Sequence, residues 1–319
     1  MSSSVLYPET PARRTRLAVV GGHELQLYEW GDPQGQPVLL LHGGPGSGLT
    51  LLHARFFDPQ RYRVIGVDQR GAGQSSPRGG IANNTTADLL ADLRALRAHL
   101  HIERWLVVGG SWGATLALLH AADAPDAVAA LLLRGVFVAR RADVDAFFNA
   151  EPAGFDLAWL PWRERAALEN LGFTEALDRV MQRGSPFEQQ ALASIWSSFE
   201  QAMDGTPAAS PTDGAALIPR YRVQAHYLHH GCFLDDRPLL QSLRAVPGVP
   251  TLLLHGANDR ICPFAGAAEV QAALPHATLL RVEGAGHAPT HPTMAAAMRS
   301  ALDTYASSAH FGMSAPAWG

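Results

Sequence analysis

Short apolar runs alternate with segments of helical periodicity along most of the chain, and this alternation predicts an α/β fold. Two early polar-apolar segments, Leu17–Val20 and Glu24–Trp30, flank a Gly-Gly pair and predict a hairpin. Mostly apolar runs typical of buried strands follow at 37–41, 62–67, 105–108, 128–133, 251–254 and 278–282. Helical spacing predicts a helix at 87–100 with Thr86 as N-cap and a second that begins directly after 111. It also predicts a helix that ends at 273 and a last one at 292–305. Strands that alternate with helices form a mostly parallel, doubly wound sheet.

The pattern changes between about Val138 and Pro238, where aromatic and charged residues increase and no buried strand is evident. A helical stripe is predicted at Phe187, Ala191, Ile195, Phe199 and Met203, and a loop at 205–211. We therefore expect a core built from 1–137 and 239–319, interrupted by a helical lid over 138–238. Such a lid would cover the carboxyl edge of the sheet, where open α/β sheets form their sites.

The segment between the run at 105–108 and the helix after it carries Gly109, Ser111 and Gly113 in the pattern G-x-S-x-G. This pattern is weak alone, but here a strand precedes it and a helix follows, which is the context of a nucleophile elbow. The glycines are expected because strand and helix approach too closely for a Cβ atom. The helix N-terminus then directs free N–H groups toward the serine oxygen.

A serine nucleophile needs a base, and the base needs a carboxylate that orients it. Asp259 follows the predicted strand at 251–254, and His287 follows the one at 278–282, so both are expected beside Ser111. Alone, Asp259 would be interpreted as a turn or capping residue and His287 as a surface histidine. Their order after the serine, each at a strand end, predicts a Ser111–His287–Asp259 triad. The backbone N–H of Trp112 and that of Gly44, with Gly43 as second choice, are the predicted oxyanion donors.

Composition narrows the function classes. The 319 residues carry a net charge of −4 and no lysine, so no basic surface indicates a nucleic-acid partner. Two cysteines are too few for a disulfide framework, no secretory leader or membrane-spanning run is evident, and we expect a cytoplasmic protein. No cofactor or metal is expected: His226, His229 and His230 have no carboxylate or cysteine at ligand spacing, so we interpret them as lid surface or packing. Nothing in the sequence indicates an oligomeric state.

Three motifs carry a family resemblance: HGGPG at 42–46, DQRGAGQSSP at 68–77 and GGSWG at 109–113. Together they resemble the proline iminopeptidases of the α/β-hydrolase superfamily, over roughly 37–134 and 249–305. The resemblance implies an α/β-hydrolase fold with an inserted lid. It also implies release of N-terminal proline from peptides, without a metal, by the triad predicted above. The stretch LRGVF at 133–137 is similar to the family's entry into the lid.

The lid matches the family less closely. WSSFE at 196–200 resembles a family stretch whose glutamate binds the substrate's free amino group, so the resemblance implies that role for Glu200. In RVQAHY at 222–227, Gln224 stands where the family has a second glutamate. Phe137 and Tyr227 are candidate walls of an apolar pocket for the proline ring. A glutamine brings no charge, so a small peptide, amide or ester with a free amino terminus would be bound more weakly.

Three alternatives can be compared with the peptidase hypothesis. A carboxylesterase or lactonase could use the same triad, and Gln224 leaves room for it. Epoxide hydrolases and dehalogenases share the predicted fold but need a carboxylate nucleophile, which Ser111 does not provide. A catalytically silent binding protein on this fold would be expected to have lost a triad member, and none is lost here.

Overall fold

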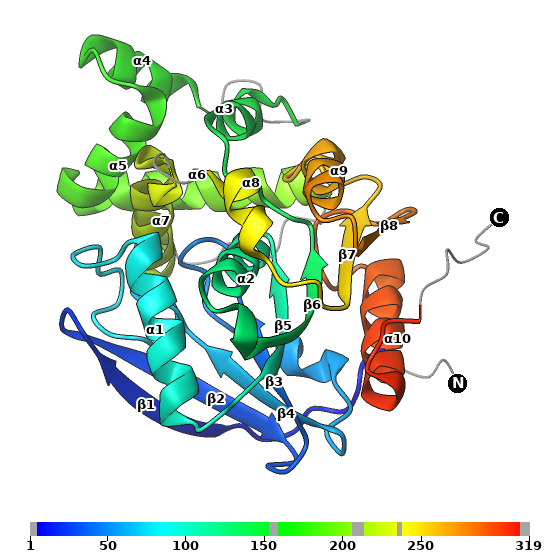
Figure 1. Cartoon of the computed structure of the whole chain (residues 1–319). Helices are drawn as coiled ribbons and strands as arrows, with labels where there is room; N and C mark the ends of the chain where they lie inside the picture. Colours follow the sequence, from blue (N-terminus) through cyan, green and yellow to red (C-terminus); the bar gives the residue numbers. More distant parts are fainter. Residues whose placement is uncertain (1–4, 153–158, 206–213, 235–237, 313–319) are drawn as a thin grey trace.

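The computed structural model describes residues 5–152, 159–205, 214–234 and 238–312, and its eight strands form one sheet (Figure 1). The strands are β1 Arg13–Val19, β2 His23–Gly31, β3 Gln36–Leu41, β4 Tyr62–Val67, β5 Trp105–Gly110, β6 Val128–Arg134, β7 Thr251–Gly256 and β8 Ala277–Val282. Their order in the sheet is β1-β2-β4-β3-β5-β6-β7-β8. Both pairs that contain β2 are antiparallel, whereas every other pair is parallel. The predicted hairpin and the mostly parallel sheet are confirmed.

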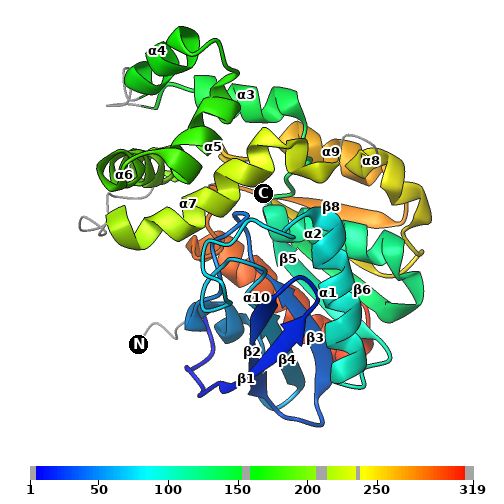
Figure 2. The same cartoon turned by 90° about the vertical axis from the view of Figure 1, so that its left-hand side faces the viewer.

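Two groups of helices surround this sheet. The first group packs on the sheet itself: α1 Thr86–His99, α2 Trp112–Asp123, α8 Leu239–Ser242, α9 Phe264–Ala273 and α10 Pro292–Ser308. The second group comes from the middle of the chain: α3 Arg141–Asn149, α4 Leu160–Leu168, α5 Phe173–Arg183, α6 Pro186–Asp204 and α7 Gly214–His229. Figures 1 and 2 show that this second group lies together on one side of the sheet, beyond the ends of β5 and β6. The division into core and lid at 138 and 238 stays our proposal.

Short 3-10 helices complete the chain between these elements. They span Leu51–Phe56, Pro125–Ala127, Gly231–Phe233 and Leu243–Ala245.

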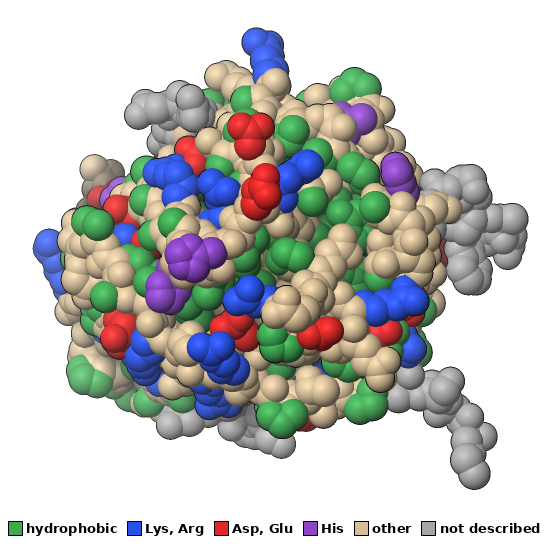
Figure 3. Space-filling model, turned by 60° about the horizontal axis from the view of Figure 1, so that its bottom comes forward, with side chains coloured by type: hydrophobic (Ala, Val, Ile, Leu, Met, Phe, Trp, Pro, Cys, Tyr) green, Lys and Arg blue, Asp and Glu red, His purple; other side chains and the backbone are tan. Residues whose placement is uncertain are grey.

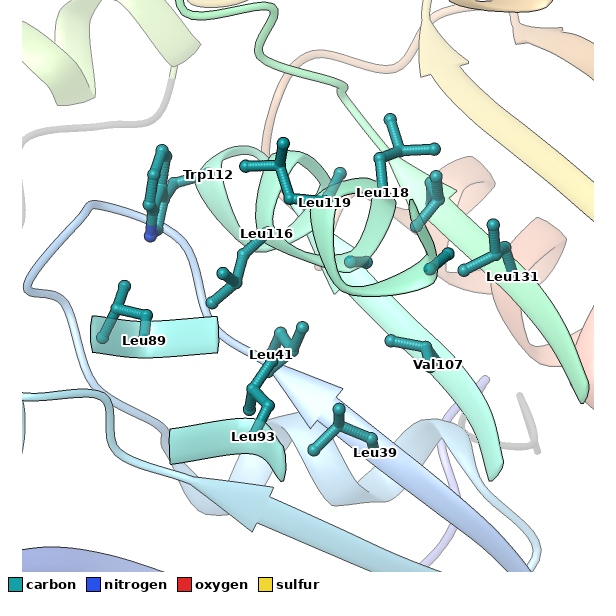
Figure 4. Packing of buried hydrophobic residues seen from close by; sticks show 14 of the residues in the cluster. Leu39, Leu41, Leu89, Leu93, Val107, Trp112, Leu116, Leu118, Leu119 and Leu131 are labelled. Atoms are coloured by element: carbon teal, nitrogen blue, oxygen red, sulfur yellow. The ribbon is translucent and has the colours of Figure 1, made fainter. Parts of the chain in front are cut away.

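Helix α2 occupies the centre of the core on one face of the sheet (Figure 4). Every residue from Trp112 to Ala121 is buried, as expected for a helix that is apolar all round. The strands alternate between two cores: Leu39 and Leu41 face the cluster around α2, whereas Val38 and Leu40 face the cluster around α10. Successive side chains of a strand point to opposite faces of the sheet, and both faces are covered here. The central strands must therefore be apolar at every position.

Two details of the helix predictions were wrong. The N-cap of α1 is Thr85, whose hydroxyl accepts from the Asp88 backbone N–H while the Asp88 carboxylate accepts from the Thr85 backbone N–H. Thr86 is buried and donates its hydroxyl proton to the Cys232 carbonyl oxygen at 2.6 Å. The reciprocal bonds made possible by an aspartate three residues downstream decide the cap.

The predicted stripe of α6 was correct only in its second half. Phe199 and Met203 are buried, but Phe187 is 80% exposed. The buried face instead begins with Leu192 and Trp196, because the aromatic side chains of α3 and the segment before α4 pack there. The loop predicted at 205–211 lies almost entirely outside the described residues.

Charged side chains of both signs are interspersed on the face of the molecule that Figure 3 presents. This distribution agrees with the small net charge of −4. Within the described ranges, no helix combines the length and the apolar character needed to cross a bilayer.

The buried contact between α2 and β5 generates a prediction about acid stability. The Trp105 indole N–H donates to His120 Nε2 at 3.1 Å, and burial lowers the pKa of His120 to about 4. The unfolded chain, with a histidine pKa of about 6.5, binds a proton that the folded chain does not. His120 therefore contributes stability that is complete above about pH 6.5 and is lost as the pH falls toward 4, by roughly 1.4 kcal/mol per pH unit.

The variant His120→Gln keeps an acceptor for the indole but cannot titrate. We expect its free energy of unfolding, measured by urea denaturation, to fall less than that of the wild type between pH 7 and pH 5. His99→Gln, at an exposed position of α1, is the matched control and should behave as wild type. An unchanged pH dependence in His120→Gln would contradict this assignment.

Candidate active site

The turn between β5 and α2 places Ser111 in an unusual backbone conformation. Its φ is 57° and its ψ is −125°, values that L-residues adopt only under structural constraint. A Cβ atom on Gly109 would come within 2.3 Å of the Gly113 carbonyl oxygen. One on Gly113 would come within 2.3 Å of the Leu41 carbonyl oxygen. The flanking glycines are thus sterically required, and the serine is held at the carboxyl edge of the sheet.

Asp259 and His287 meet at the same edge. Asp259 lies in the loop after β7 and His287 in the loop after β8, and His287 Nδ1 is 2.8 Å from Asp259 Oδ2. The other carboxylate oxygen, Oδ1, accepts the backbone N–H groups of Ile261 at 3.0 Å and Cys262 at 2.8 Å. The Asp259 side chain is 1% exposed and that of His287 is 13% exposed. The carboxylate is therefore locked in place, while the imidazole reaches the cavity.

The electrostatic environment keeps Asp259 ionised. Burial alone would raise its pKa, but His287 and the backbone N–H of Cys262 more than offset burial and hold the pKa of Asp259 below its ordinary value. A second histidine, His255, lies with Nε2 3.6 Å from Asp259 Oδ2, and burial lowers the pKa of His255. His255 is accordingly neutral at pH 7 and leaves His287 as the imidazole that Asp259 can orient.

Ser111 and His287 line one cavity of about 440 Å³ between the sheet edge and the second group of helices. Among the described residues no hydrogen bond joins the two side chains. Cys262 lines the same cavity, and burial raises the pKa of its thiol well above the ordinary value. A protonated thiol is not a nucleophile. The hydrogen bond between a catalytic serine and its histidine is often absent or long in a free enzyme and forms when a substrate binds.

The predicted oxyanion donors surround the serine. Trp112 is the first residue of α2, so its backbone N–H has no partner within the helix. Gly43 and Gly44 both line the cavity, and Gly44 has a φ of +114°. A Cβ on Gly43 would lie 3.2 Å from the Ser111 Cβ, so the backbone of this loop passes directly beside the serine. Which of the two glycines donates stays a prediction.

The far wall of the cavity carries Glu200 and its partners. Glu200 Oε2 accepts from Arg220 Nη2 at 2.6 Å and from the Tyr221 hydroxyl at 3.0 Å, and Oε1 accepts from Gln224 Nε2 at 2.7 Å. Glu200, Arg220 and Gln224 all line the cavity. The Oε1 atom of Gln224 is buried and has no partner. This oxygen is therefore closed to solvent in the present conformation, although the residue Gln224 borders the cavity.

The two predicted aromatic walls have different positions. Phe137 lines the cavity. Tyr227 does not: it is completely buried behind the site, where its ring packs edge-on against Trp112 and its hydroxyl donates to Asn84 Oδ1 at 3.0 Å. Tyr227 was predicted as a wall of the proline pocket, and the structure does not place it there, because its position in α7 directs the ring into the core.

Two arginines of the cavity were not predicted as functional residues. Arg134, at the end of β6, is buried, and its Nη1 donates to the His287 carbonyl oxygen, so it fixes the histidine loop. A signal for it existed in the family-like stretch LRGVF. Arg220 has no such signal, because its importance depends on the side chain of Glu200 from another helix.

Comparisons with known proteins extend this picture. The model of a family described as alpha/beta hydrolase fold matches residues 36–291. A proline iminopeptidase of Xylella fastidiosa is 37% identical over 314 residues, which cover 94% of this chain and 99% of that protein. A proline iminopeptidase of Xanthomonas citri is 36% identical over 315 residues, with coverage of 94% and 99%.

Among solved structures, a bacterial membrane phospholipase A superimposes with a TM-score of 0.61 and 21% identity. The superposition covers 92% of this chain and 86% of that one. At this level of identity the likeness concerns the fold alone.

Proposed function

The chain belongs to the α/β-hydrolase fold family and, within it, to the proline iminopeptidases, and from this premise we propose that it is a serine aminopeptidase releasing N-terminal proline from peptides. The observation that carries the proposal is that His287, on the wall of the cavity that Ser111 also lines, has its Nδ1 2.8 Å from the buried carboxylate of Asp259 behind it. Three side chains from three separate strand ends meet at the carboxyl edge of the sheet, in the chain order Ser, Asp, His that is typical of this fold.

The proposed reaction begins at the first peptide carbonyl of the substrate. Ser111 Oγ attacks this carbon while His287 Nε2 takes the hydroxyl proton, and Asp259 stabilises the imidazolium through Nδ1–H. The oxyanion receives hydrogen bonds from the backbone N–H of Trp112 and from that of Gly43 or Gly44. His287 then protonates the leaving amine, which leaves a prolyl ester on Ser111. A water molecule, deprotonated by His287, hydrolyses that ester and restores the serine.

Substrate selection is assigned to the opposite wall. A protonated N-terminal amine would approach the carboxylate of Glu200, which has the neutral amide of Gln224 beside it on the cavity wall. Phe137 offers an apolar surface for the proline ring. An amine held at this wall positions the first carbonyl, and not a later one, at Ser111. The arrangement thereby supports cleavage of a single residue from the amino end.

A carboxylesterase or lactonase activity is the second candidate, and the ion pair of Glu200 with Arg220 favours it. Arg220 Nη2 lies 2.6 Å from Glu200 Oε2, so the carboxylate of Glu200 already has a cationic partner. With Gln224 in place of a second carboxylate, the attraction for a cationic substrate is reduced. The binding of a neutral ester does not depend on a free carboxylate, so the ion pair of Glu200 with Arg220 would not weaken it.

The triad assignment predicts a graded loss of turnover. Ser111→Ala and His287→Ala should each lower kcat by several orders of magnitude, because they remove the nucleophile and its base. Asp259→Asn should lower kcat by about 10⁴-fold or less, since the aspartate orients and stabilises the imidazole without reacting. The measurement is single-substrate kinetics with a proline arylamide, with circular dichroism as the control for folding. Near-normal turnover of a folded Ser111→Ala enzyme would refute the mechanism.

Amine recognition is tested with proline arylamide, its N-acetylated form and a neutral aryl ester. Glu200→Gln should raise KM for the free amine and hardly change hydrolysis of the ester. Gln224→Glu should lower KM for the free amine by about tenfold or more, because a charge-assisted hydrogen bond contributes about 1.5–3 kcal/mol. Gln201→Glu, which adds a carboxylate elsewhere on the cavity wall, is the matched control.

Efficient cleavage of the N-acetylated substrate by the wild type would contradict the amine anchor. If the aryl ester is then the best substrate, the esterase or lactonase function takes its place.

A further inference from the structure

Away from the cavity, the second group of helices contains a cluster of one carboxylate and two imidazoles. Asp178 lies on α5, His226 lies on α7, and His230 follows α7 one helical turn after His226. Each residue offers one potential ligand atom, and these three atoms lie within 4.8 Å of one another. None of the three residues lines the cavity of Ser111. The cluster is therefore a second, separate grouping of titratable side chains.

Two atoms of this cluster are buried without a hydrogen-bond partner. Asp178 is 5% exposed. Its Oδ1 atom has no hydrogen-bond partner, whereas its Oδ2 atom accepts from Gln182 Nε2 at 2.6 Å. The Nδ1 atom of His226 is also buried and unpartnered. Buried polar atoms are nearly always satisfied, and an exception needs an explanation. A cation bound by this cluster would give unpaired atoms of this kind a partner.

The imidazoles are prepared to act as ligands. His230 Nδ1 lies 2.8 Å from the His226 carbonyl oxygen and donates to it, which leaves Nε2 as the free acceptor of His230.

We propose that Asp178, His226 and His230 bind one divalent transition-metal ion of the zinc type, with water as the remaining ligand. Imidazole and carboxylate donors in this number suit zinc. Two histidines four residues apart present their rings on one face of a helix, as in other helical zinc sites. Donor atoms in a tetrahedral zinc site are closer together than 4.8 Å, so binding requires a small contraction. His230 is exposed and can supply that movement.

The consequence of binding is mechanical. The ion would connect α5 to α7, and α7 also carries Arg220 and Gln224, the residues beside Glu200 in the cavity. A metal would therefore hold the helix of the far cavity wall without touching the reacting atoms. This proposal is independent of the function assigned to the cavity.

The test uses the full chain after chelator treatment and dialysis, titrated with Zn²⁺ by calorimetry at neutral pH and with Co²⁺ by visible absorption. We expect the wild type to bind one equivalent of Zn²⁺ that Asp178→Asn and His230→Gln bind at least about tenfold more weakly. Co²⁺ should give a spectrum typical of nitrogen and oxygen ligands in the wild type only. His229→Gln is the matched control, since this neighbouring histidine is outside the cluster and should bind like wild type.

His230→Gln carries most of the test because His230 is exposed and its replacement should leave the fold intact. Circular dichroism of both variants checks this. Absence of zinc binding by the wild type would overturn the proposal and leave the cluster as ring packing of His226 and His230 against Phe233. Equal binding by a folded His230→Gln, or an equal loss in His229→Gln, would overturn it as well.

Discussion

The close approach of α2 to the end of β3 is the constraint on which the rest of the site depends. Because Gly113 has no side chain, the first turn of α2 lies against the carbonyl oxygen of Leu41, and Ser111 is forced into its positive φ. This one contact puts the serine at the carboxyl edge, directs the helix N-terminus to the cavity and brings the loop of Gly43 and Gly44 beside it. The burial of α2 in the core then keeps that geometry rigid.

Much of the fold could be predicted from the sequence because buried parallel strands leave a strong signal. Runs such as Val38–Leu41 pack on both faces and must be apolar throughout, so their positions are readable without a structure. The N-cap of α1 was misplaced by one residue, since Thr85 and Thr86 are chemically alike and only the partner Asp88 distinguishes them. The stripe of α6 failed at Phe187 because periodicity indicates that a helix has a buried face but not which neighbours will cover it.

The candidate site likewise combines residues that could be predicted from the sequence with contacts that could not. Ser111, Asp259 and His287 each follow a predicted strand, and the topology of parallel strands brings such positions together. The contacts of the lid side are between helices that are far apart in the sequence, and nothing local encodes them. The pairing of Arg220 with Glu200, the inward turn of Tyr227 and the approach of Asp178 to His226 all belong to this second kind. Specificity is thus harder to predict from sequence than the reaction type.

The proposed reaction depends on Ser111 as a nucleophile that is activated by the pair of His287 and Asp259. The most direct measurement is labelling of the full chain with a serine-reactive phosphonate, followed by mass spectrometry of its peptides. If Ser111 is the nucleophile, it is modified stoichiometrically and in step with loss of activity, and much more slowly in His287→Ala. An active enzyme in which Ser111 stays unmodified, or in which another residue takes the label, would contradict it.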